Sequence, residues 1–133
     1  TGNTEKMAKA VADGGRSVAG TEVETNYYVP EEQLSDYDAI LVGTPTYHHD
    51  MPGTIKNCFE DVAAKNVSLK GKIGAAFGSY GWSGESIQMM TDTMKHIFGM
   101  NMMEPGLKVL RKPDESGLKE CQDFGRKIDE KLK

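Results

Sequence analysis

The first residues of the chain combine small polar side chains with a glycine, a pattern that could hold a phosphate group. Thr1, Gly2, Asn3 and Thr4 lead directly into a predicted amphipathic helix. The unpaired N–H groups and the positive dipole end of a helix stabilise an anion there without a lysine. The hydroxyl and amide groups add donors, and Gly2 lets the backbone come close. The same residues also fit an ordinary helix cap, with Asn3 or Thr4 as the capping residue.

Two later segments, 44–50 and 78–84, could supply the rest of a ligand site. Each follows an apolar run that predicts a buried parallel strand, and each mixes polar groups with aromatic rings. The candidate residues are Thr44, Pro45, Thr46, Tyr47, His48 and His49 in the first segment and Ser79, Tyr80, Gly81, Trp82 and Gly84 in the second. Phosphate donors at one end and aromatic planes at the other describe a nucleotide-like ligand.

Helical and strand periodicities alternate along the chain. The predicted helices cover residues 5–18, 54–64, 85–98 and 114–132, and the predicted strands cover 21–29, 39–43, 73–77 and 100–110, the last interrupted by Pro105 and Gly106. Ile87, Met90, Met94 and Ile97 share one face of the third helix. This order predicts a doubly wound parallel α/β sheet. Ligands of such sheets bind beyond the carboxyl ends of the strands, where residues 1–4, 44–50 and 78–84 would meet.

Composition limits the classes of function. The chain has 133 residues, of which 38% are apolar and 27% charged, and its net charge is −4, which suits a single domain over 1–133 and argues against a nucleic-acid partner. No apolar run has membrane-spanning length and no signal-peptide pattern is present, so we expect a cytoplasmic protein without a membrane partner. Cys58 and Cys121 lack the spacing of a metal or redox pair and are expected to be free thiols.

At these residues the chain resembles the flavodoxins. The segment from Thr1 to Glu5 is similar to the end of their phosphate loop, Thr/Ser-x-Thr-Gly-Asn-Thr-Glu. Residues 43–52 and 74–84 are similar to the flavodoxin domain of the A-type flavoproteins, which include diiron flavoproteins and F420H2 oxidases. Residues 104–107 and 121–128 are similar to the closing strand and helix of that domain. The resemblance covers nearly the whole chain.

The resemblance implies a three-layer α/β/α sandwich with a five-stranded parallel sheet in the order 2-1-3-4-5. It implies FMN as the cofactor, bound by the candidate residues of the three segments, with no catalytic residue and no metal. Tyr47 and Trp82 would flank the isoalloxazine ring, and Tyr80 could serve instead. The implied function is a carrier of low-potential electrons between redox proteins, as a monomer or weak homodimer.

The chain departs from the family pattern in two ways. No strand precedes Thr1, whereas flavodoxins have their first strand immediately before the phosphate loop. We therefore expect the native chain to carry roughly ten more residues there, which is a typical strand with its turn. The chain also shows no trace of the β-lactamase-like metal domain of A-type flavoproteins. Reduction of oxygen or nitric oxide at a diiron site is therefore not implied.

Three alternatives stay open. One is an NAD(P)H-dependent quinone or flavin reductase on the same fold, and another is the flavodoxin domain of a larger A-type flavoprotein, acting as a partner-binding module. The third concerns His48, His49 and Asp50, which have side chains that zinc or iron can use. We favour a loop beside the flavin for these residues, because neighbouring side chains point in different directions. The choice of FMN over FAD rests on the resemblance.

Overall fold

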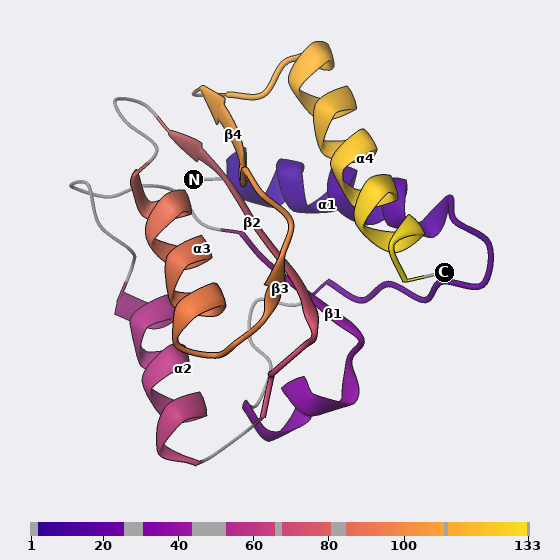
Figure 1. Ribbon diagram of the computed structural model, residues 1–133. Coiled ribbons are helices and arrows are strands. Elements are labelled where there is room, and N and C mark those ends of the chain that lie inside the picture. Colours follow the sequence, from indigo (N-terminus) through magenta and orange to yellow (C-terminus); the bar gives the residue numbers. More distant parts are fainter. Residues whose placement is uncertain are drawn as a thin grey trace.

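A parallel sheet lies between two pairs of helices in the computed structural model, which describes residues 3–25, 31–43, 53–65, 68–80, 85–110 and 112–132 (Figure 1). The strands are β1 (Ala39–Gly43), β2 (Ile73–Tyr80), β3 (Asn101–Met102) and β4 (Leu107–Leu110), and a short 3-10 helix, η1 (Glu31–Asp36), precedes β1. The helices are α1 (Asn3–Arg16), α2 (Gly53–Ala64), α3 (Glu85–His96) and α4 (Glu115–Glu130). The predicted α/β fold with a parallel sheet is confirmed. Within these ranges, no helix has the length and apolarity to cross a membrane.

Strand β2 lies at the centre of the sheet and pairs with all three other strands. Its first half is in register with β1, from Ala39 opposite Ile73 to Gly43 opposite Phe77. On its other side, β3 pairs with residues 73–74 and β4 with residues 77–80, all in parallel. The gap between β3 and β4 spans residues 103–106, where Pro105 and Gly106 predict an interruption. The number and order of strands are defined here for the described residues alone.

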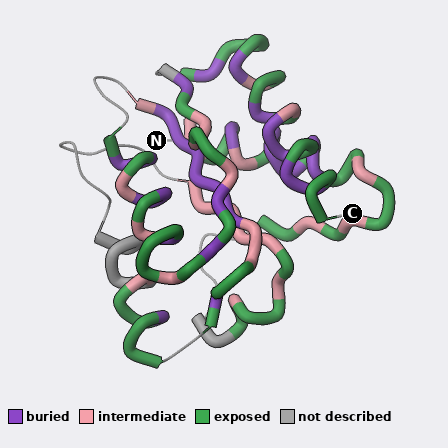
Figure 2. The backbone as a smooth tube through the Cα atoms, in the orientation of Figure 1, coloured by how far each residue is buried: buried purple, intermediate pink, exposed green. Residues whose placement is uncertain are grey.

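The two faces of the sheet are covered by different helices. Ala75 and Phe77 of β2 lie in a buried cluster with residues of α1 and α4, while Ala76 lies with Ile87 and Met90 of α3. Figure 2 shows the resulting line of buried residues along β2. A strand covered on both faces needs apolar side chains at successive positions, and this explains the continuous apolar runs of β1 and β2.

Helices α1 and α4 pack with almost no side chain between their backbones. A Cβ atom added to Gly125 would overlap the carbonyl oxygen of Val11, and one added to Gly14 would overlap the carbonyl oxygen of Gln122. Helix α4 is capped at its start by Asp114, whose side chain accepts a hydrogen bond of 2.8 Å from the Gly117 N–H. On the inner face of α4, Cys121 and Ile128 are fully buried.

Two local predictions are wrong. Residues 21–25 of the strand predicted over 21–29 form no strand, and residues 26–30 lie outside the described part of the chain. A strand forms only where a neighbour pairs with its backbone, and here the Arg16 guanidinium donates to the Val23 carbonyl at 3.2 Å instead. Ile97 is 70% exposed rather than buried, because α3 ends at His96 and the chain turns at Gly99 with a φ of 68°.

The Cys121 thiol lies in the core cluster between the sheet and helices α1 and α4. Burial, followed by the nearby charge of Glu120, raises the pKa of the Cys121 thiol to about 11. A thiol with such a pKa is protonated near neutral pH, so it is not a nucleophile there. The side chain of the other cysteine, Cys58, lies outside the described residues.

Replacing Gly125 by alanine should destabilise the protein by about 2–3 kcal/mol, because the new methyl group must push α1 and α4 apart. In an exposed helix interior the same change would stabilise by about 1 kcal/mol, so the sign of the change is informative. Urea unfolding followed by circular dichroism measures it. Lys119→Ala, on the exposed side of α4, is the control and should shift stability by no more than about 0.5 kcal/mol. A stabilised Gly125→Ala protein would contradict the close helix contact.

The raised pKa of Cys121 should also make stability fall at high pH. The thiol ionises near 9 in the unfolded chain and near 11 in the folded one, so its stabilising effect is complete below about pH 9 and is lost toward pH 11. Between pH 8 and 10.5 the wild type should lose about 1–2 kcal/mol more than Cys121→Ala, which has no thiol to ionise there. Urea unfolding of both proteins at each pH tests this. Parallel pH profiles would contradict the assignment.

Candidate functional site

Two predicted ligand-binding residues, 75 positions apart in the sequence, meet at the carboxyl end of the sheet. The Thr4 Oγ1 and Ser79 Oγ atoms lie 3.4 Å apart, and either hydroxyl could donate. Thr4 belongs to the first turn of α1, and Ser79 is the last but one residue of β2. Figure 1 shows the start of α1 beside the tip of the β2 arrow. The structure thus brings the first and third predicted segments together.

Asn3 and Thr4 are helical residues rather than part of a loop before the helix. Helix α1 begins at Asn3, and both side chains are half-buried. Their backbone N–H groups belong to the first turn, in which no intrahelical acceptor is available. The correction therefore leaves them at the end of the helix that attracts anions.

Ser79 and Tyr80 are also placed differently from the prediction, which had a loop beginning at Gly78. Strand β2 continues to Tyr80 because residues 78–80 pair with Lys108, Val109 and Leu110 of β4. Ser79 is buried and Tyr80 half-buried. Both side chains are therefore carried by a hydrogen-bonded strand, which holds a site more rigidly than a loop does.

The other candidate residues lie outside the described part of the chain. They are Thr1, Gly2, Thr44, Pro45, Thr46, Tyr47, His48, His49, Gly81, Trp82 and Gly84. In the sequence, residue 44 follows the last residue of β1 and residue 81 the last residue of β2. Because β1 and β2 are parallel, both segments leave the sheet at its carboxyl edge, the side on which Thr4 and Ser79 meet.

Gly43 has a packing role that the sequence analysis did not assign. A Cβ atom on this last residue of β1 would lie 2.5 Å from two ring atoms of Phe77. The buried Phe77 ring thus occupies the space that a side chain at position 43 would need. The signal in the sequence was a glycine at the end of an apolar run, immediately before a candidate ligand segment.

The metal alternative at His48, His49 and Asp50 falls on residues that the structure does not describe. Among the residues that it does describe, no group of three or more His, Cys, Asp or Glu side chains is placed to hold a metal ion. The described part of the site instead offers hydroxyl groups, an amide and backbone N–H groups. These are neutral donors, and they suit an anionic or polar ligand.

Comparison with known families decides the classification. The sequence model of the family described as "Flavodoxin" matches residues 1–133. The chain belongs to the flavodoxin family. Flavodoxins are FMN-binding electron carriers, so the FMN and electron-transfer expectations are confirmed at the level of the family.

Related proteins include both flavodoxins and larger flavoproteins. A structure titled as a flavodoxin from the domain Archaea has a TM-score of 0.90 and 38% identity, and the match covers 99% of this chain and 92% of that one. The type A flavoprotein fprA of Rhodobacter capsulatus is 35% identical over 98% of this chain but only 31% of its own length. A protein of Moorella thermoacetica named nitric oxide reductase is 33% identical, over 95% of this chain and 32% of its own. This flavodoxin therefore spans between about a quarter and a third of the length of the curated relatives that it matches.

Proposed function

We propose that this flavodoxin binds FMN at the carboxyl edge of its sheet and carries electrons between redox proteins. The observation that carries the proposal is the meeting of Thr4 and Ser79 at the start of α1. Their separation of 3.4 Å is longer than a usual O–H···O bond of about 2.7 Å. A hydroxyl group can donate one hydrogen bond and accept two, so Thr4 and Ser79 can each form a further hydrogen bond to a ligand.

The phosphate end of the proposed site is formed by Thr1, Gly2, Asn3 and Thr4. Hydroxyl and amide donors from these residues would surround the phosphate, together with the N–H groups of the first turn of α1. The helix dipole favours negative charge at this position by about 0.3–1 kcal/mol or more. The site fits a phosphate dianion held by neutral donors.

The ring end of the proposed site is formed by the segments that leave β1 and β2. We assign ring stacking to Tyr47 and Trp82, with Tyr80 as the alternative on the strand itself. Stacked aromatic pairs contribute about 0.5–1.5 kcal/mol beyond their buried area. The remaining contacts would come from Thr44, Pro45, Thr46, His48 and His49 in one segment and Ser79, Gly81 and Gly84 in the other.

FMN supplies one-electron and two-electron transfer when it is bound, and the residues of this chain hold and orient it and exclude water. No substrate-converting residue is needed for that role. The net charge of −4 would steer the protein toward basic faces of redox partners, through small and transient contacts. We propose one FMN-binding unit over residues 1–133, present as a monomer or weak homodimer in the cytoplasm.

A second candidate role is that of a flavodoxin module within a larger A-type flavoprotein. It is favoured by the 35% identity to the type A flavoprotein fprA, whose match covers 98% of this chain. The FMN site would be the same in that role. The electron acceptor would then belong to the same polypeptide or to an associated subunit rather than to a separate redox protein.

FMN binding by purified apoprotein tests the proposal. The wild type should quench flavin fluorescence with one FMN per chain. Thr4→Val should weaken FMN binding by about 10-fold to 100-fold, because a hydrogen bond to a charged group contributes about 1.5–3 kcal/mol. Titration of apoprotein into FMN gives both affinities.

Thr93→Val is the matched control. The Thr93 hydroxyl donates to the Met89 carbonyl within α3, at 2.9 Å, and the next residue, Met94, lies against Gly74 at the start of β2, the end opposite Ser79. It should bind FMN as the wild type does. A folded wild type that leaves FMN fluorescence unchanged would overturn the proposal. Sustained NADPH oxidation with a quinone as acceptor would support the reductase alternative instead.

A further inference from the structure

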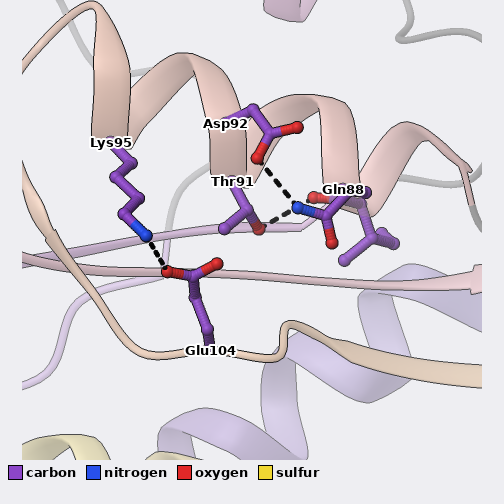
Figure 3. A network of polar contacts seen from close by, with 6 residues as sticks. Gln88, Thr91, Asp92, Lys95 and Glu104 are labelled. Carbon is purple, nitrogen blue, oxygen red and sulfur yellow. Dashed lines mark hydrogen bonds and ion pairs between the residues drawn. The ribbon is translucent and has the colours of Figure 1, made fainter.

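The connection between β3 and β4 leaves the sheet edge and contacts α3. Residues 103–106 form this connection, and it begins with a hydrogen bond of 2.8 Å from the Met103 N–H to the Gly74 carbonyl. The Glu104 carboxylate then reaches the ammonium group of Lys95 on α3, with Nζ and Oε2 2.8 Å apart (Figure 3). This ion pair ties the outer side of the connection to the last turn of α3.

Gly106, in the same connection, lies against both α3 and β2. A Cβ atom at this position would lie 2.6 Å from Cγ2 of Ile87 and 2.8 Å from the carbonyl oxygen of Ala76. Gly106 is not among the glycines with a positive φ, so glycine is needed here for space and not for backbone conformation. The first turn of α3 thus packs directly on the backbone of this connection.

The side chain of Thr91, one turn further along α3, also borders the space around Gly106. Its hydroxyl donates to the Ile87 carbonyl at 2.9 Å and lies 3.4 Å from the position that a Cβ atom at Gly106 would take. Ile87 and Thr91 are both almost completely buried. An added methyl group at position 106 has no empty space nearby, so it would have to displace α3 or β2.

A displacement of α3 has a direct consequence for the proposed FMN site. Strand β2 ends at Tyr80 and α3 begins at Glu85, so only residues 81–84 join them. Gly106 lies against Ala76 of β2 and Ile87 of α3 and therefore sets the spacing between these two elements. Three of the four joining residues, Gly81, Trp82 and Gly84, are proposed flavin contacts.

We propose that Gly106 is a positioning residue for the FMN site. Because Gly106 has no side chain, the first turn of α3 can pack closely against β2. Gly106 thereby fixes the distance between these two elements, which precede and follow Trp82 in the sequence. Glu104 supports the same position from outside through its ion pair with Lys95. The role of FMN in this inference rests on the proposed function, whereas the spacing of α3 and β2 does not.

Gly106→Ala tests the inference, with Gly71→Ala as the matched control. Gly71 has a φ of 81° and open space around it, and it precedes β2 at the end opposite Tyr80. Both substitutions should lower the urea midpoint. Only Gly106→Ala should weaken FMN binding, by about tenfold, because a site depends on placement to within about 0.5 Å. Equal FMN affinity in the two variants would overturn the inference.

Trp82 provides a readout that does not depend on FMN. It is the one tryptophan of the chain, so the tryptophan emission of the apoprotein reports on the surroundings of Trp82. Gly106→Ala should shift this emission and Gly71→Ala should not. If the wild type fails to bind FMN, the proposed function is wrong, and the emission comparison still decides whether Gly106 positions this segment.

A milder pair of variants covers the case in which Gly106→Ala does not fold. Glu104→Gln removes the ion pair with Lys95, and Asp123→Asn removes the exposed ion pair of 3.3 Å with Arg126 on α4. Glu104→Gln should weaken FMN binding by about twofold to threefold and shift Trp82 emission, while Asp123→Asn should do neither. The absence of any difference between them would overturn the inference.

Discussion

A strand buried on both faces must give its backbone N–H and C=O groups to neighbouring strands, and β2 is that strand here. Its partners are β1 on one side and β3 with β4 on the other. This pairing fixes Gly43 beside Phe77 and Ser79 beside Val109. The last residue of β1 therefore lies opposite Phe77, three residues before β2 ends at Tyr80.

The small side chains of the same strand allow the helix layers to come close. Its residues from Gly74 to Ala76 are small, and the flexible side chains of Met94, Met100 and Met102 fill the space above Gly74. On the other face, Gly14 and Gly125 let α1 and α4 approach until backbone meets backbone. Close layers leave little tolerance for added volume, and this is why single glycines determine the placement of whole helices.

The sequence predicted what depends on local pattern. The apolar runs of β1 and β2 and the interruption at Pro105 and Gly106 were readable from the sequence. It could not predict that β2 continues through Ser79 to Tyr80, because that extension depends on pairing with residues about thirty positions later. The strand expected near Val23 failed for the related reason that alternation of side chains does not supply a pairing partner. Of the candidate site, Thr4 and Ser79 were named from the sequence as separate candidates, and that they lie 3.4 Å apart could be seen only in the fold.

The proposed FMN site is anchored by two parts of the fold that lie in different helix layers. Its phosphate end is the first turn of α1, which is positioned by the contact of α1 with α4 on one face of the sheet. Its ring end follows β1 and β2 and leads into α3 on the opposite face, where Gly106 sets the spacing. Neutral donors at the phosphate end would hold the cofactor there. Phosphate binding at α1 and placement of the ring beside α3 would thus depend on different helix contacts, a division that suits a protein whose cofactor must stay bound while its electron count changes.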